Sequence, residues 1–238
     1  MPVAAFMKIA HHAIARILAS EPTLSHLILD TEHGAFADAD LELLCGLIAS
    51  MGKESVIRVP GPSPEAVGRA LDRGADGVMI PRVTGAEDTE AALRGLVLSP
   101  RGARGWDPTA AGYAYGRGPL RTTPRCFIQI ETTGALGDAR RIGQLPGVTD
   151  LFVGPADLSR ALGAEGEIFS PAVVREIERL AQRPGTDVRL GLFVDTAARA
   201  RWAYGLGYRF FAVTADVALL IRGVREATEG IAALGRGS

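Results

Sequence analysis

The chain has 238 residues, of which 47% are hydrophobic and 22% are charged, and its formal net charge is -1. This balance is ordinary for a folded globular protein and excludes a largely disordered chain. The small net charge gives no broad attraction to nucleic acid or to an anionic membrane, and no apolar run approaches the roughly 20 residues that span a bilayer.

The cysteines and the first residues bear on the cellular compartment. The opening segment MPVAAFMKIAHH lacks the basic stretch and apolar core of a signal peptide. Cys45 and Cys126 stand in unrelated contexts and form no CxxC pair, so we expect two buried thiols rather than a disulfide. A cytoplasmic location is therefore predicted.

Short apolar runs alternate along the chain with longer stretches of helical spacing. The runs predict eight strands, near residues 3–8, 26–30, 55–59, 77–80, 126–131, 150–153, 189–193 and 209–213. Helices are expected between them, for example over residues 38–50. The next helix has Ser63 as its N-cap, Pro64 in its first turn and Gly74 as its C-cap, and the later segment SPAVVREIERLAQR begins with the same Ser-Pro pair.

Eight strand–helix units in a chain of this length predict an α/β fold, a (β/α)8 TIM barrel forming one domain over residues 1–238. The alternative is a doubly wound open sheet, whose nucleotide-binding form needs GxGxxG after the first strand. Here the first strand runs into KIAHHAIARIL without a glycine, which favours the barrel. Residues 99–125, rich in Gly, Arg and aromatic residues, are expected to form a long loop on the active-site face after the fourth strand, with some helix inside it.

Polar side chains follow the ends of five consecutive predicted strands. They are Asp30, Glu32 and His33 after the second strand, Arg58 and Arg82 after the third and fourth, Gln129 and Glu131 after the fifth, and Asp157 after the sixth. Taken singly, Glu131 and Asp157 could serve the following helix, and His33 could be an ordinary loop histidine. An arginine inside an apolar strand, such as Arg58, needs an anion nearby. Because all five strand ends of a barrel meet at one mouth, they together indicate an active site.

The chemistry that fits these residues uses a metal ion. Glu131 and Asp157, carboxylates on adjacent strands without clustered Cys or His, predict a hard oxygen site for Mg²⁺, Mn²⁺ or a similar divalent ion. A 2-oxo acid would chelate such an ion, and the ion together with Arg58 would stabilise an enolate. His33, oriented by Asp30 or Glu32, could move the proton.

A substrate carboxylate has its own predicted site. The backbone N–H groups around Gly154, Pro155, Ala156 and Asp157, at a helix N-terminus, could bind it.

Two other kinds of barrel active site are disfavoured. The chain has two lysines. Lys53 precedes the third strand, and Lys8 lies at the exit of the first strand without other features of a Schiff-base site. A mechanism that forms a Schiff base with a lysine is therefore disfavoured. The segments after strands seven and eight lack the glycine-rich turns of a barrel phosphate site, although Arg101 and Arg104 in the long loop keep a phosphorylated substrate open.

At these residues the sequence resembles the class II pyruvate-dependent aldolases of the HpcH/HpaI family, such as 4-hydroxy-2-oxoheptanedioate aldolase. The resemblance runs nearly end to end, and its carriers are LDTEH, IRVP, RALDRGADGVMIPRV, SPRGARG, QIET, FVGPADLS and GYRFFAVTADVALL. It implies a metal-dependent barrel, with Mg²⁺, Mn²⁺ or Co²⁺, that makes or breaks a carbon–carbon bond between pyruvate and an aldehyde.

The resemblance also implies roles for single residues. Glu131 and Asp157 match the metal ligands, Arg58 matches the arginine on the keto and enolate oxygen, His33 with Asp30 matches the acid–base dyad, and Gln129 matches a residue near the oxo acid. The family is typically a homohexamer in which the last helix is exchanged between subunits, and the apolar segment VALLIRGVREATEGIAAL agrees with this.

Departures from the family pattern leave the acceptor open. HGAF and VTAD replace the usual continuations after the histidine and after strand eight. Three alternatives stay open: a related 2-oxo acid enolate enzyme that condenses, as in citrate formation, or decarboxylates; a CoA-thioester lyase of the citrate lyase β-subunit type; and a barrel that binds an oxo acid only as a sensor.

Overall fold

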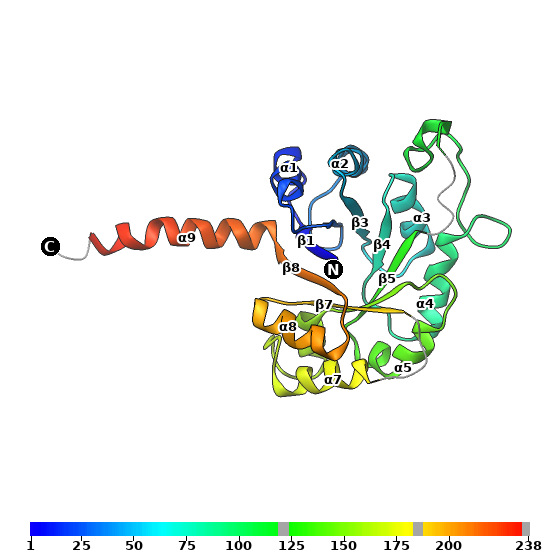
Figure 1. Ribbon diagram of the computed structural model, residues 1–238. Coiled ribbons are helices and arrows are strands. Elements are labelled where there is room, and N and C mark those ends of the chain that lie inside the picture. Colours follow the sequence, from blue (N-terminus) through cyan, green and yellow to red (C-terminus); the bar gives the residue numbers. More distant parts are fainter. Residues whose placement is uncertain (119–123, 183–187, 235–238) are drawn as a thin grey trace.

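The computed structural model describes residues 1–118, 124–182 and 188–234, and its strands close into a barrel (Figure 1). All neighbouring strands are parallel and follow one another around the barrel in chain order. The strands are β1 Val3–Met7, β2 His26–Asp30, β3 Glu54–Arg58, β4 Gly77–Ile80, β5 Arg125–Ile130, β6 Asp150–Val153, β7 Arg189–Phe193 and β8 Phe210–Ala215. The predicted TIM barrel is confirmed. The bounds of β2, β4, β6 and β7 are those predicted. β1 differs by one residue at one end, and β3, β5 and β8 differ by one or two residues at both ends.

Helices follow the strands on the outside of the barrel. They are α1 His12–Ser20, α2 Asp38–Ser50, α3 Pro64–Asp72, α4 Ala86–Leu93, α5 Thr133–Gly143, α6 Pro155–Ala161, α7 Pro171–Ala181, α8 Ala197–Leu206 and α9 Asp216–Leu234, with 3-10 turns η1 Arg94–Leu96 and η2 Ala111–Gly116. The Ser63 hydroxyl accepts from the Ala66 N–H at 3.2 Å, as its predicted N-cap role requires. The predicted C-cap is wrong by one position, because Arg73 caps α3 and Gly74 follows it with φ +92°.

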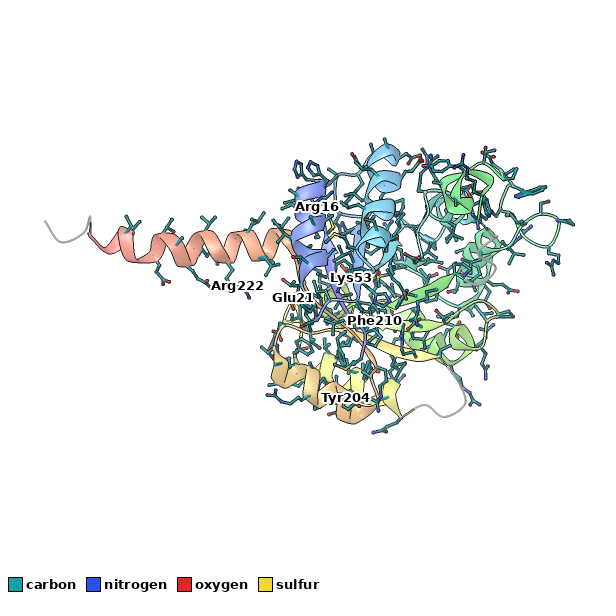
Figure 2. All side chains as sticks on the ribbon, turned by 45° about the horizontal axis from the view of Figure 1, so that its top comes forward. Arg16, Glu21, Lys53, Tyr204, Phe210 and Arg222 are labelled. Carbon is teal, nitrogen blue, oxygen red and sulfur yellow. The ribbon has the colours of Figure 1, made fainter. Side chains whose placement is uncertain are left out.

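The strands send alternate side chains into the barrel lumen and outward against the helices. The lumen is filled by an apolar layer of Ala4, Phe6, Ile28, Val56, Met79, Phe127, Phe152, Phe210 and Ala212. The rings of Phe127 and Phe210 lie 4.8 Å apart in it, and Phe210 is at the centre of the molecule (Figure 2). On the amino-terminal side, the Arg189 guanidinium stacks on Phe210 and pairs with buried Asp150. The lumen is therefore closed from that side by this ion pair, and on the other side the apolar layer is followed by the polar residues at the carboxyl ends.

The long segment before β5 does not lie where the sequence predicted it. It follows α4 and η1 rather than β4 directly, so it leads to the amino end of β5. The Tyr115 hydroxyl donates to Glu42 of α2 at 2.6 Å, and Arg104 donates to Asp72 of α3 at 2.6 Å. The prediction that residues 99–125 form an active-site loop was wrong, because the unrecognised helix α4 already takes the chain away from that face. Residues 119–123 lie outside the described part.

The remaining sequence predictions about the fold concern thiols and membrane spans. Cys45 and Cys126 are both buried, as expected, and are not joined in a disulfide. Among the helices that the structure describes, none has the length and apolar character needed to cross a bilayer.

Candidate active site

A small cavity opens at the carboxyl ends of the strands, directly above the apolar layer of the lumen. Its volume is about 230 Å³. It is lined by Phe6, Lys8, Arg58, Gln129, Glu131, Phe152, Gly154, Pro155, Ala156, Asp157, Ile168, Phe193 and Ala215. The cavity thus combines convergent charged groups with an apolar wall, which is the composition expected of a small-molecule site.

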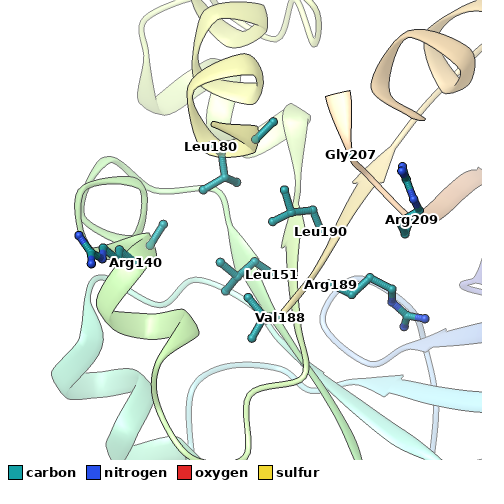
Figure 3. A pocket seen from close by; sticks show the side chains of 10 residues that line it. Arg140, Leu151, Leu180, Val188, Arg189, Leu190, Gly207 and Arg209 are labelled. Atoms are coloured by element: carbon teal, nitrogen blue, oxygen red, sulfur yellow. The ribbon is translucent and has the colours of Figure 1, made fainter. Parts of the chain in front are cut away.

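A larger cavity on the flank of the barrel has a different character. It has a volume of about 370 Å³ and lies outside β6 and β7 (Figure 3). Leu151, Leu180 and Leu190 point toward one another there, whereas the Arg189 side chain points away (Figure 3). No Asp, Glu or His lines it within the described residues, so we place the site at the strand ends.

The first element of the site is a buried ion pair between neighbouring strands. Asp30 and Arg58 end β2 and β3 and are register partners. Arg58 donates from Nε to Asp30 Oδ1 at 2.9 Å and from Nη2 to Oδ2 at 2.6 Å, which is a bidentate pair. The guanidinium also lies over the Phe6 ring, 5.1 Å from its centroid. Arg58 is therefore held rigidly with its Nη1 side toward the cavity residue Gln129, at 3.5 Å from Oε1.

This pair shifts both pKa values. Burial alone would raise the pKa of Asp30, but the hydrogen bonds and the charge of Arg58 hold it below its ordinary value. Burial would lower the pKa of Arg58, and the Asp30 carboxylate more than offsets that and raises it. Both groups are therefore ionised at neutral pH.

Glu32 is a second buried carboxylate, which the sequence predicted only as an alternative partner that orients His33. Its side chain is only 6% exposed, and its oxygens lie 3.2 Å from Arg58 Nη1 and 2.9 Å from Arg82 Nε. It thus links the ends of β3 and β4. The motif DTEH carried the signal, because its second acid lies as close to the strand exit as its first.

Glu131 follows β5 and is held by two hydrogen bonds. Gln129 Nε2 donates to its Oε2 at 2.8 Å, and the Arg82 backbone N–H donates to its Oε1 at 2.7 Å. Arg82 has a φ of 57°, an uncommon backbone conformation outside glycine, which places its N–H there. Glycine is needed at position 154, since a Cβ there would lie 2.6 Å from Glu131 Oε2. Thr132, not Glu131, caps α5, so the capping interpretation of Glu131 is wrong.

The Glu131 and Asp157 carboxylates fit a divalent ion. Burial raises the pKa of Glu131 to about 7, and the charges of Asp157 and Glu32 add to the increase although Arg82 and Arg58 oppose it. Within the described residues neither Glu131 nor Asp157 has an ion-pair partner. No described group of three or more His, Cys, Asp or Glu is arranged for a metal, so an ion there would have two protein ligands and further positions for small molecules.

His33 lies at the edge of the site. Its ring is 53% exposed, with Nε2 3.8 Å from Glu32 Oε2. Its contact with Asp30 is through the backbone, whose N–H donates to Asp30 Oδ1 at 3.2 Å. The pairing of the His33 ring with Asp30 stays a prediction, and the ring's described neighbour is Glu32.

The structure brings the predicted site residues together around one cavity. The predicted residues that line it are Arg58, Gln129, Glu131, Gly154, Pro155, Ala156 and Asp157. Asp30 reaches the site through its pair with Arg58, and His33 through its contact with Glu32, which also pairs with Arg58. Arg104 lies elsewhere, buried and paired with Asp72. The long loop therefore adds no support for a phosphate site.

Comparison with known proteins identifies the family. Residues 3–223 match the family model described as HpcH/HpaI aldolase/citrate lyase. The chain belongs to this family and is an aldolase. It is 32% identical over 220 residues to a hydroxypyruvate/pyruvate aldolase of Paraburkholderia phytofirmans, covering 86% of this chain and 84% of the relative. It is 30% identical over 204 residues to a 4-hydroxy-2-oxo-heptane-1,7-dioate aldolase of Salmonella paratyphi A, covering 83% and 78%.

A solved structure agrees with this assignment. A HpcH/HpaI aldolase/citrate lyase family protein of Burkholderia cenocepacia J2315 superposes with a TM-score of 0.86 at 32% identity, covering 97% of this chain and 94% of that one. The barrel described above is therefore the fold of the HpcH/HpaI aldolases.

In this HpcH/HpaI aldolase, we expect Asp30→Asn to lower the free energy of unfolding by about 3–5 kcal/mol at pH 7, because it leaves the buried Arg58 charge without its partner. The folded-state pKa of Asp30 is depressed, so its contribution is complete above the ordinary value of 3.8 and is lost as the pH falls below it. Urea unfolding of both proteins at several pH values should show their difference shrinking in acid.

The matched control is Asp195→Asn, which removes an exposed pair with Arg199. It should cost less than about 1 kcal/mol. A difference between wild type and Asp30→Asn that stays constant through the acid range would contradict the assignment of the pair.

Proposed function

We propose that this chain is a metal-dependent aldolase that cleaves or forms 4-hydroxy-2-oxo acids through a pyruvate enolate and an aldehyde. The observation that carries the proposal is that one cavity is lined by the ion-paired Arg58 and by two acids, Glu131 and Asp157, that have no cationic partner in the described part of the chain. The names of the relatives, which include pyruvate aldolases, support a pyruvate donor.

Glu131 and Asp157 would hold the divalent ion, Mg²⁺, Mn²⁺ or Co²⁺. When bound, the ion supplies Lewis-acid stabilisation of negative charge on the oxo acid. Arg58 presents its Nη1 group toward the keto oxygen and stabilises the enolate with a fixed positive charge. Gln129, whose amide already bridges Arg58 and Glu131, orients the oxo acid beside them.

The substrate carboxylate and the proton have separate sites in this proposal. The backbone around Gly154, Pro155, Ala156 and Asp157, at the start of α6, binds the pyruvate carboxylate. His33 acts as the acid–base group on the aldehyde oxygen. Its ring is open to the mouth and near an acid, which suits a group that exchanges protons with solvent.

Exchange of the pyruvate methyl protons in D₂O, followed by NMR, tests the enolate half of the reaction. We expect exchange in the metal-loaded protein, none after EDTA treatment, and recovery with Mg²⁺, Mn²⁺ or Co²⁺. Arg58→Ala and Glu131→Ala should each lower the rate by at least about 100-fold, the scale of losing one electrostatic stabiliser. Exchange at the wild-type rate after rigorous metal removal, or in either variant, would overturn the mechanism.

Carbon–carbon cleavage is tested by incubating the protein with a panel of 4-hydroxy-2-oxo acids and measuring released pyruvate. Citrate-type condensation and CoA-thioester cleavage are measured in parallel as the competing reactions. Release of pyruvate from a 4-hydroxy-2-oxo acid supports the aldolase proposal, and turnover only of a CoA thioester contradicts it. A sensor would bind pyruvate and show no exchange.

Metal binding should depend on pH through Glu131. Its pKa of about 7 means that it is protonated in acid, and a carboxyl must lose its proton to bind an ion. We expect the Mn²⁺ affinity, measured by calorimetry, to rise about tenfold per pH unit below 7 and to level off above it. Glu131→Gln should bind more weakly and lose this slope, whereas an affinity of wild type that ignores pH would contradict the assignment.

We also propose that residues 1–238 form one catalytic domain. In the proposed assembly the protein is a homohexamer, and α9 packs on a neighbouring subunit. The helix projects away from the barrel (Figure 1). It exposes the apolar side chains Leu220, Ile221, Val224 and Ile231. A helix with this much uncovered apolar surface needs a partner in water. The cytoplasmic location predicted from the sequence stays a proposal.

The double variant Leu220→Glu/Val224→Glu should lower the molecular mass in solution, measured by light scattering, because two charges would be buried in the contact. Arg222→Gln on the same helix removes only an exposed pair with Glu226 and should leave the mass unchanged. An unaltered mass in the double variant would contradict the proposed role of α9.

A further inference from the structure

Lys8 is a charged residue of the cavity that the proposed reaction does not use. It directly follows β1. Two and four residues before it in this strand, Phe6 and Ala4 point into the lumen and belong to the apolar layer. Period-2 alternation therefore directs Lys8 to the lumen at the level of the polar site. It lines the cavity, and its side chain is 34% exposed.

The backbone of Lys8 is held firmly. Its N–H lies 3.0 Å from both carboxylate oxygens of Asp216, a buried residue at the start of α9. Its carbonyl accepts from the Ala35 N–H at 3.4 Å, and a Cβ at Gly34 would lie 3.0 Å from its Cα. The long side chain thus extends from a fixed point at the cavity edge.

The Lys8 ammonium has unused capacity for an anion. Its described ion-pair partner is Asp30, with Nζ 3.8 Å from Oδ2, beyond hydrogen-bond distance. Asp30 is already bound on both oxygens by Arg58. No hydrogen bond from Lys8 Nζ is present among the described residues. The other cation of the cavity, Arg58, is paired with Asp30 and Glu32, and its cavity-facing edge is assigned to the enolate oxygen.

The position of Lys8 within the cavity indicates which molecule it meets. Glu131, Asp157 and Gln129 come from β5 and β6, where the oxo acid is proposed to bind. Lys8 comes from β1, and the apolar side chains Phe193 and Ala215 line the same cavity from β7 and β8. This part of the cavity, which adjoins β2 and therefore the proposed acid–base group His33, is left for the electrophile that adds to the enolate.

We propose that Lys8 is a specificity-determining residue that binds the carboxylate of an acidic aldehyde as it adds to the pyruvate enolate. The proposal rests on the proposed function. The cavity of about 230 Å³ lies below the usual range of roughly 300–1,000 Å³ for ligand pockets, so the aldehyde is short.

The residue type supports this role. All but two of the 26 Lys and Arg residues of the chain are arginines. A guanidinium at position 8 would compete with Arg58 for bidentate pairing with Asp30, whereas an ammonium is a compact point charge on a flexible stem. A loose, partly exposed pair with Asp30 contributes little to stability, so a structural role alone does not explain the lysine.

The test compares two aldehydes of equal chain length, glyoxylate with a carboxylate and glycolaldehyde with a hydroxymethyl group, as partners of pyruvate in the metal-loaded protein. In Lys8→Met, kcat/KM should fall at least about tenfold with glyoxylate, the scale of losing one charge-assisted hydrogen bond, and less than about twofold with glycolaldehyde. Lys8→Arg should recover part of the preference. Arg16→Met, which removes an exposed cation on α1 (Figure 2), should change neither value.

Equal loss with both aldehydes, loss beyond detection with both, or no change in Lys8→Met would overturn the role of Lys8. Pyruvate methyl exchange in the wild type separates this failure from failure of the proposed function. A wild type that exchanges protons but shows an unchanged preference in Lys8→Met overturns the Lys8 proposal alone. A wild type without exchange overturns the proposed function, and the Lys8 proposal with it.

Discussion

The site depends on the buried pair of Asp30 and Arg58. A guanidinium at the end of an apolar strand is stable only if an anion faces it, and β2 supplies that anion at the adjacent register position. Both Asp30 oxygens are used, which removes the rotational freedom of Arg58 and leaves one edge of the guanidinium toward the cavity. A charge stabilises a transition state best when it is already oriented before the substrate binds. The pair with Asp30 orients Arg58 in this way.

The barrel makes the pair possible through its alternating strands. The side chains of Phe6, Phe127 and Phe152 fill the lumen one step below the polar groups. They exclude water from beneath Arg58 and strengthen each electrostatic contact above them. Because the same alternation continues by two residues past Phe6 and Phe127, it brings Lys8 and Gln129 into the cavity. The apolar layer and the site are therefore successive layers of inward-facing side chains on the same strands.

Much of this arrangement could be predicted from the sequence, for a physical reason. Buried parallel strands read as apolar runs, and their carboxyl ends share one mouth, so Arg58, Glu131 and Asp157 were predictable without coordinates. Glu32 was harder to place, because its contacts depend on the turn after β2 and on the side chain of Arg82, which comes from a different strand. The long segment before β5 was placed on the wrong face, since it was expected directly after the fourth strand and the short helix α4 lies between them.

The mouth of the barrel has two halves, which differ in how the charges of their carboxylates are compensated. Asp30 and Glu32 are compensated by Arg58 and Arg82, and this half is complete as the chain folds. Glu131 and Asp157 have no cationic partner among the described residues, and the raised pKa of Glu131 records the cost of ionising it there. In the proposed function, a divalent cation would remove that cost in the second half and would add nothing to the first. The ion would therefore be needed beside Glu131 and Asp157. Arg58, which is paired with Asp30 and Glu32, would stay a separate positive charge for the proposed enolate.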